Sequence, residues 1–484
     1  MQKEKSIGRN ILIVVLILVT IASVCAGLFA WAKYQTTING TATGETAKWS
    51  FKVSDGDTST QEIEFPMTRT DNNTSVAEGK IAPGTYGELE IGIDATGTET
   101  ALTYVIEGTT ENLPTNLKFY SDAERTLELT VLDNKFTKGG YMKLNEIGER
   151  TETIYWEWPF ETGITSSVIK ENDILDTQDS SKTMNMKVSV TGKQVNGNPI
   201  LADLVQVGDY VNYNASSNGT HTFTADDCTN ILKSDEVNIG NITISDTIST
   251  DDVFNSDAKA QWRVLSVDRQ TGIIELIAID PTVQRVSLYG GKGFVNAVEV
   301  LNNIGSIYGH GKGAQKGRSI QEEDIEQYTV YDPYRFKNYG NEKTYSTGDF
   351  YIEERDKDGN VIKYDNKITT AGEGENTITM KQTYYYVAED RFSKTINDLL
   401  YKNSTDSSIN KPDYWVASQC VHLSSSCLFC MRIVKNASLN MHDLYRSTGE
   451  KIGPQYKVCP VVELQTNIQT TGQDENGVWQ LNVN

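Results

Sequence analysis

The stretch GELEIGIDATGTETALTYVIEG, residues 87–108, alternates apolar and polar side chains on either side of a turn-forming centre. Alternation at every second position is typical of a strand with one buried face, because successive side chains point to opposite sides. The pattern recurs in the first half of the chain, at 47–53, 127–132, 153–160 and 186–195. The sequence therefore predicts a mainly β fold that begins with a β-sandwich at 33–196.

The chain starts with Lys3, Lys5 and Arg9, followed by an uncharged apolar run at 11–32. At about 1.5 Å per residue, a helix of this length crosses a bilayer core of roughly 30 Å. Ala30-Trp31-Ala32 also offers a small-x-small cleavage site, so residues 1–32 are predicted as either a cleaved signal or a transmembrane helix. The rest is expected to be exported, either membrane-anchored at the cell surface or in an extracellular matrix.

The remaining length suits two globular domains, because domains usually run about 100–200 residues. The motif NGNPI breaks regular structure and predicts a linker at 197–203, with a second domain at 204–484. The formal net charge of -21 argues against nucleic acid as a partner, since phosphate binding needs clustered Lys and Arg.

The first domain carries FAWAKYQTTINGTATGETAKWSFKV, IAPGTYGELEIGIDATGTETALTYVI, YWEWPFE and VSVTGKQV in that order. Over residues 1–196 this order resembles the TasA/camelysin class of Gram-positive surface proteins. The resemblance implies a jelly-roll-like sandwich and a place in extracellular fibres or the cell-surface matrix. Camelysin relatives have also been classed as metallopeptidases, which raises a peptidase as an alternative.

The second domain is predicted to be α+β. Strands at 260–268 and 272–280 share a turn and form a hairpin, and Phe294 to Tyr308 carry apolar residues at helical spacing. A capping box from Ser319 to Glu322 predicts a second helix, and a third is expected at 391–402. The Tyr-rich stretch 328–382 is interpreted as a polar insertion that contains a hairpin, and a strand follows at 383–389.

The motifs WRVL, YWVAS, MRIV and CPVVEL follow one another in this domain. Their order resembles a C-type-lectin-like domain of clostridial and phage surface proteins, one subset of which comprises the variable proteins of diversity-generating retroelements. Cys459 stands where the family pattern has Arg. The resemblance implies a scaffold that displays side chains from its C-terminal strands and binds a ligand.

Three cysteines crowd into YWVASQCVHLSSSCLFCMRIV, residues 414–434. Cys427 and Cys430 have zinc-knuckle spacing, but the sequence between and after them reads as a strand, on which residues three apart face opposite sides. In an exported domain a disulfide among Cys420, Cys427, Cys430 and Cys459 is an alternative, with three pairings open. A nucleophilic Cys420 would need His422 as its base and a third, orienting group, which the sequence does not indicate.

Two readings of the whole chain compete with ligand binding: a structural subunit of a matrix fibre that self-assembles, and an enzyme of the camelysin or formylglycine-generating type. No HExxH motif or catalytic triad is present, so the sequence predicts a non-enzymatic protein without catalytic residue, metal or cofactor. The ligand is expected to be a protein or a carbohydrate. The predicted binding face lies within 414–462 and comprises Gln419, Cys420, His422, Ser424, Ser426, Phe429, Asn440, His442 and Tyr445.

Overall fold

The computed structural model describes much of the chain after residue 80. The described residues are 52–54, 62–65, 76–77, 80–160, 166–215, 220–222, 247–249, 262–282, 285–329, 335–346, 348–355, 361–370, 377–387, 389, 392–402, 410–448 and 450–483. None of the helices in these ranges is long and apolar enough to span a membrane. The predicted signal or transmembrane segment at 1–32 lies outside them, as do Cys25 and Cys228.

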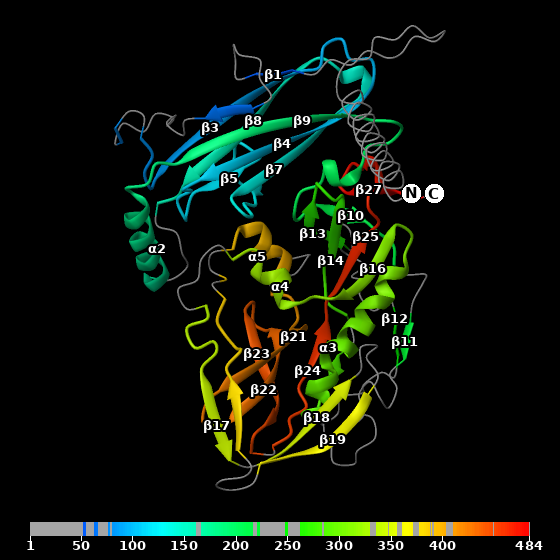
Figure 1. Cartoon of the computed structure of the whole chain (residues 1–484). Coiled ribbons are helices and arrows are strands. Elements are labelled where there is room, and N and C mark those ends of the chain that lie inside the picture. The colour runs from blue at the N-terminus through cyan, green and yellow to red at the C-terminus, as the bar shows by residue number, and fades with distance from the viewer. Residues whose placement is uncertain are drawn as a thin grey trace, which may run out of the picture.

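The N-terminal part of the described chain forms two antiparallel sheets around one shared core (Figure 1). One sheet has the order β1 (Lys52–Ser54), β3 (Thr85–Asp94), β8 (Glu149–Trp158), β5 (Lys118–Tyr120) and β6 (Glu128–Leu129). The other has the order β2 (Glu62–Phe65), β9 (Asn185–Gln194), β4 (Leu102–Glu111) and β7 (Lys135–Met142). Ile91 and Trp156 from the first sheet meet Tyr104 and Val188 from the second in the core. The mainly β prediction is confirmed.

Most strands expected from alternation are present, whereas β7 escaped prediction. Its sequence, KFTKGGYM, is interrupted by Gly139 and Gly140, which hide the periodicity. Both glycines are required by close packing. A Cβ on Gly140 would lie 2.1 Å from the ring of Tyr104, and one on Gly139 would lie 1.9 Å from the backbone oxygen of Asp203.

A helix, α2 (Ser166–Asp179), packs beside the sandwich, although the sequence shows no clear helical periodicity before residue 196. It is attached through polar contacts rather than an apolar stripe. Asp176 accepts hydrogen bonds from Trp158 Nε1 and Asn116 Nδ2, both at 2.8 Å. Asp179 accepts one from the Thr115 backbone N–H at 2.6 Å. Because buried carboxylates replace apolar residues here, the hydrophobic pattern could not reveal the helix.

The second domain contains two large sheets. The seven-stranded sheet has the order β16 (Ala314–Ser319), β25 (Pro460–Leu464), β14 (Ile273–Ala278), β13 (Trp262–Asp268), β10 (Tyr210–Asn212), β27 (Trp479–Asn482) and β26 (Gln469–Gln473). The five-stranded sheet has the order β15 (Val286–Ser287), β24 (Gln455–Val458), β21 (Tyr414–Leu423), β22 (Cys427–Val434) and β23 (Leu439–Arg446). The predicted hairpin is β13–β14, closed by a 2.8 Å bond from the Gly272 N–H to the Asp268 carbonyl.

Three two-stranded sheets complete the strands of the described residues. They pair β11 (Thr220–Thr222) with β12 (Thr247–Ser249), β17 (Glu342–Ser346) with β20 (Thr377–Lys381), and β18 (Gly348–Arg355) with β19 (Val361–Thr370). The β18–β19 pair is the hairpin expected within the insertion; its turn at 356–360 lies outside the described residues.

Helix α3 (Gly290–Ser306), continued by η4 (Ile307–His310), agrees with the predicted apolar stripe and covers one face of the five-stranded sheet. The second predicted helix starts later than expected, because Ser319 ends β16. In α4 (Glu322–Glu326), the Asp324 carboxylate caps the Gln321 backbone N–H at 2.7 Å. Helix α5 (Lys394–Tyr401) has Ser393 as its N-cap. In Figure 1, α4 and α5 lie between the sandwich and the five-stranded sheet.

Residues expected to form a linker instead form a packed joint. The short helix η2 (Leu201–Asp203) is buried, with Leu201 and Ala202 in the core of the second domain. Asp203 faces the sandwich, where it accepts hydrogen bonds from Thr103 Oγ1 at 3.2 Å and Lys193 Nζ at 2.8 Å. The sandwich and the second domain therefore meet through specific buried contacts. A further 3-10 turn, η1 (Leu144–Glu146), lies within the sandwich.

Candidate functional site

An extended segment, residues 382–387, follows β20 and lies along the edge of β21. The backbone N–H groups of Thr383 and Tyr384 donate to the Val421 carbonyl at 2.9 and 3.0 Å. In return, Thr383 Oγ1 accepts from the Val421 N–H at 2.7 Å. Of the strand predicted at 383–389, residues 383–387 are described as one segment, and they show no regular strand pairing. Its attachment fixes three consecutive tyrosines against the sheet.

These tyrosines meet aromatic side chains from residues 335–339 and β21. Phe336 lies 4.5 Å from Tyr385 and 5.2 Å from Tyr339 between ring centroids. On the other side, Tyr384 lies 5.3 Å from the rings of both Tyr386 and His422. A cavity of about 200 Å³ opens here. Its lining consists of Lys337, Asn338, Gln382, Tyr384, Tyr385, Tyr386 and His422. We call the cavity and the adjoining rings of Phe336 and Tyr339 the aromatic cleft.

The aromatic cleft leaves apolar surface in contact with solvent. Phe336 is 48% exposed, Tyr339 51% and Tyr386 63%, and all three belong to the few large hydrophobic residues exposed in the described chain. Single exposed hydrophobic residues are ordinary, whereas a cluster of them around a cavity is typical of a ligand-binding or protein-binding surface.

A buried ion pair supports the floor of the aromatic cleft. The Arg432 side chain is fully buried on β22 and pairs with Glu322 of α4. Its Nη2 also donates to the Tyr385 carbonyl at 2.9 Å, and its guanidinium lies 4.6 Å from the centroid of the Tyr384 ring. Arg432 Nε and Nη1 have no hydrogen-bond acceptor among the described residues. The pair therefore ties α4, β22 and the tyrosine segment together.

The charges around the cleft are largely neutralised. Arg335 pairs with Glu326 at 2.8 Å, and Arg432 pairs with Glu322. Burial raises the pKa of Glu322 to about 7, and the Arg432 charge opposes that shift. Burial also raises the pKa values of Tyr384 and Tyr385 well above their ordinary value and lowers the pKa of His422. At neutral pH the cleft therefore offers neutral hydroxyl, imidazole and amide groups beside the amine of Lys337.

The nine residues predicted as a binding face are divided between two sides of the five-stranded sheet. Phe429 and Tyr445 pack with Phe294 on the α3 side, and His442 Nδ1 lies 2.7 Å from the Tyr456 hydroxyl there. Asn440 lies opposite Ile433 and shares this side, and Gln419 Nε2 donates to the Phe294 carbonyl. Cys420 and His422 lie on the other side, against Tyr384. Ser424 and Ser426 lie in the β21–β22 turn.

Three of these nine residues are too buried to contact a ligand at the surface. Cys420 is 2% exposed, Phe429 9% and Tyr445 3%, since α3 covers one side of the sheet and the tyrosine segment covers the other. In this arrangement only His422 of the nine lines the aromatic cleft.

The four described cysteines are free thiols and all are buried. Cys427 lies in the cluster with Phe429 and Tyr445, whereas Cys430 lies with Cys420 and Tyr384 on the opposite side. The prediction that Cys427 and Cys430 face opposite sides of a strand is therefore confirmed. Cys459 lies in a third cluster, where its thiol donates to the Ala278 carbonyl at 3.8 Å.

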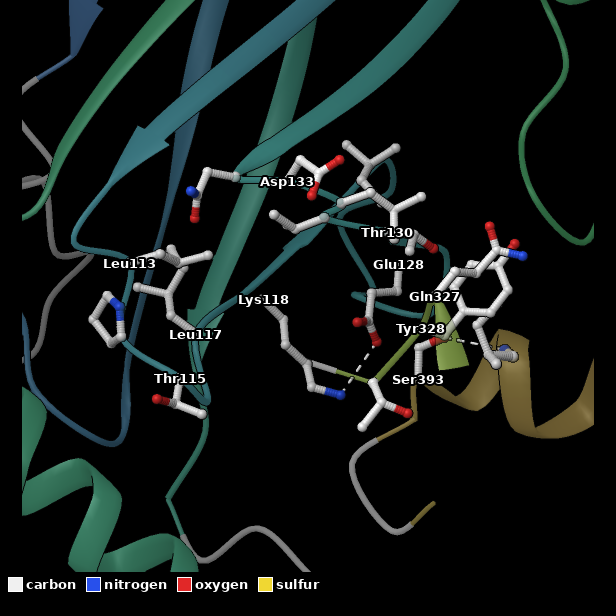
Figure 2. Close-up of a pocket in the computed structure, with 17 residues that line it drawn as sticks. Leu113, Thr115, Leu117, Lys118, Glu128, Thr130, Asp133, Gln327, Tyr328 and Ser393 are labelled. Atoms are coloured by element: carbon white, nitrogen blue, oxygen red, sulfur yellow. Dashed lines mark hydrogen bonds and ion pairs between the residues drawn. The ribbon is translucent and has the colours of Figure 1, made fainter. Parts of the chain in front are cut away.

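A larger cavity of about 580 Å³ lies between the sandwich and the second domain (Figure 2). One side is lined by residues 113–115, 117–118 and 128–134, and the other by residues 327–329, Ser393 and Ile396. On the sandwich side, Lys118 Nζ and Glu128 Oε2 form an ion pair at 3.2 Å. Burial raises the pKa of Glu128, and Lys118 opposes the shift. Lys118 and Glu128 are therefore already paired with each other, and exposed aromatic rings are lacking among the residues that line this cavity.

No protein-family model matches the sequence, and no curated protein matches it.

The sequence pointed to the cleft only indirectly. His422 was predicted as a ligand-binding residue, but the aromatic residues at 336, 339 and 384–386 were assigned to an insertion and a strand. One signal in the sequence could have indicated the cleft, namely the three consecutive tyrosines before Val387. A strand with one solvated face does not favour an unbroken aromatic run.

Proposed function

We propose that the chain is an exported cell-surface binding protein whose second domain binds carbohydrate at the aromatic cleft. The observation that carries the proposal is the gathering of exposed Phe336, Tyr339 and Tyr386 beside a cavity lined by amide, imidazole and hydroxyl groups. Tyrosine is suited to this task because its ring gives rigid apolar contact and its hydroxyl can form hydrogen bonds.

The chemistry of the cleft favours a small neutral ligand, since Lys337 is the one basic residue among otherwise uncharged lining residues. Its volume of about 200 Å³ is below the roughly 300–1,000 Å³ typical of drug-sized sites. Because Arg335 and Arg432 are already paired with Glu326 and Glu322, these guanidiniums are poorly placed to select an anionic ligand. A sugar ring has an apolar face for the aromatic rings and hydroxyl groups for Asn338 and His422, whose Nδ1 has no hydrogen-bond partner among the described residues. One sugar unit of a longer glycan matches this combination.

The proposal assigns the two domains different tasks. The sandwich, proposed to be a TasA/camelysin-like jelly roll, would attach the protein or assemble at the cell surface. The second domain, proposed to have a C-type-lectin-like fold, would present the cleft. Two sheets around one core support the first assignment. A helix-covered five-stranded sheet, together with the CPVVEL strand β25 of the seven-stranded sheet, is compatible with the second.

Glycan binding by the full chain, purified in mild detergent, tests this function. On an array that includes bacterial cell-wall polysaccharides, we expect binding that Tyr386→Ala or Tyr339→Ala weakens about tenfold, equal to roughly 1.4 kcal/mol. Phe160→Ala is the matched control, because Phe160 is 72% exposed but belongs to the sandwich. Absence of glycan binding, or equal binding by all three variants and the unchanged chain, would refute the proposal.

A further inference from the structure

Cys420 and Cys430 face each other across two paired strands. In the β21–β22 pair they are direct cross-strand partners, whereas Cys427 pairs with Leu423 near the turn. Directly opposed residues in an antiparallel pair have Cα atoms about 4.5 or 5.5 Å apart. Disulfides accept Cα separations of about 4.4–6.8 Å, so the backbone meets this distance requirement.

The side chains are also brought together. Both cysteines are buried in a small cluster with Tyr384, and a hydrogen bond between their thiols contributes to raising the pKa of Cys430. Arg432, on the same side of the sheet, interacts electrostatically with Cys420. The two other described cysteines have different surroundings: Cys427 lies on the α3 side, and Cys459 lies beside Ala278.

We propose that Cys420 and Cys430 are a redox pair that forms a cross-strand disulfide, leaving Cys427 and Cys459 as thiols. This selects one of the six single bridges that four cysteines allow. The bridge would fix β21 to β22 directly beneath Tyr384, and so beneath the aromatic cleft.

The oxidant is an external disulfide, and the exchange is balanced. The Cys420 thiolate attacks one sulfur of that disulfide, which forms a mixed disulfide and releases the first external thiolate. The Cys430 thiolate then attacks the Cys420 sulfur, so the protein disulfide forms and the second external thiolate leaves. Two protein thiols are oxidised, one external disulfide is reduced, and the two protons pass to the released thiolates.

Peptide mapping tests the pairing without reference to glycan binding. The full chain in detergent is equilibrated with oxidised and reduced glutathione in sub-denaturing urea, which speeds local opening around the buried thiols. It is then unfolded, alkylated and cleaved with chymotrypsin. Trypsin is unsuitable, because no Lys or Arg separates Cys420 from Cys430, whereas chymotrypsin can cut after Leu423, Leu428 and Phe429.

We expect a linked pair of peptides carrying Cys420 and Cys430, two hydrogens lighter than the separate thiols, with Cys427 and Cys459 alkylated. Reduction with dithiothreitol should remove the link. The link should persist in Cys427→Ser and disappear in Cys430→Ser. The unsubstituted chain tests the proposal even if a variant misfolds. If Cys420 and Cys430 are both alkylated after oxidation, the proposal is wrong. It is also wrong if Cys420 or Cys430 forms a disulfide with Cys427 or Cys459. A glycan result cannot change this outcome.

Discussion

Arg432 puts a permanent charge on a strand position that is completely buried. The cost of removing it from water is offset by Glu322, by the Tyr385 carbonyl and by the faces of two tyrosine rings. Such a pair contributes less to stability than its strong attraction suggests, because both ions lose hydration. Its clearest effect is geometric, since the guanidinium holds Tyr384 and Tyr385 where they line the cleft.

Arg432→Met should lower the free energy of unfolding of the second domain by about 3–5 kcal/mol, because Glu322 would be buried without its cation. Adding Glu322→Gln should recover part of the loss. Urea denaturation followed by tryptophan fluorescence measures both. The control is Arg446→Met, since Arg446 pairs with Asp443 and Glu450 near the surface and should cost less than about 1 kcal/mol. Equal losses for the two arginines would contradict the structural role assigned to the pair.

Helix α3 and the turn η4 pass directly over β16, and glycines make this crossing close. A Cβ on Gly309 would lie 2.1 Å from the Gly317 backbone nitrogen, and one on Gly305 would lie 2.0 Å from the Arg318 carbonyl carbon. The Gly-rich sequence GHGKGAQKGRS, residues 309–319, therefore includes both sides of a tight backbone contact. The last part of this sequence, Ala314–Ser319, forms the strand β16.

Gly305→Ala should destabilise the second domain. Alanine in a helix is intrinsically better than glycine by about 1 kcal/mol, but a buried clash with backbone atoms costs about 1–3 kcal/mol or more. The clash should outweigh the gain in helix propensity, since the backbone atoms of Arg318 and Ser319 cannot rotate away from the added methyl group. Gly148→Ala is the control, because nothing lies within 4 Å of its added Cβ. Thermal unfolding measures both, and an unchanged or higher Tm for Gly305→Ala would show that the crossing can relax.

Across the whole molecule, the joint at η2 connects two separate hydrophobic cores. Asp203 is buried and binds Thr103 and Lys193 of the sandwich, while its neighbours Leu201 and Ala202 belong to the second core. Arg269 adds a second connection, as its side chain donates to the Val205 carbonyl at 2.5 Å and to Thr137 of β7. The larger cavity of Figure 2 exists because the domains are held in this position.

Asp203→Ala should loosen the joint, because Thr103 loses a buried acceptor, a change worth about 1–3 kcal/mol. Hydrogen–deuterium exchange should then be about tenfold faster or more at the amides of residues 201–205, with little change in β3 or β22. Lys143→Ala is the control, since it removes an exposed ion pair with Glu146 within the sandwich. If exchange at 201–205 stayed slow, the apolar contacts alone would hold the joint.

Features carried by local pattern were determined by the sequence. Alternation at 87–93 and 102–108 gave β3 and β4, the turn at 268–272 gave the β13–β14 hairpin, and helical spacing from Phe294 gave most of α3. Each depends on which face of one element is buried, and that information lies within a few residues. The predicted family folds are a different matter and stay predictions.

Only the tertiary structure decided the sites. The cleft combines residues 336–339, 384–386 and 422, and the Cys420–Cys430 pair depends on the register of two strands. The residues predicted as a linker form a joint because Asp203 accepts hydrogen bonds from Thr103 and Lys193, which lie 100 and 10 positions earlier in the sequence. Helix α2 was hidden because polar contacts to distant residues hold it. In each case the deciding interaction joins different elements, some of them far apart in the chain, and periodicity carries no information about which elements will meet or in which register.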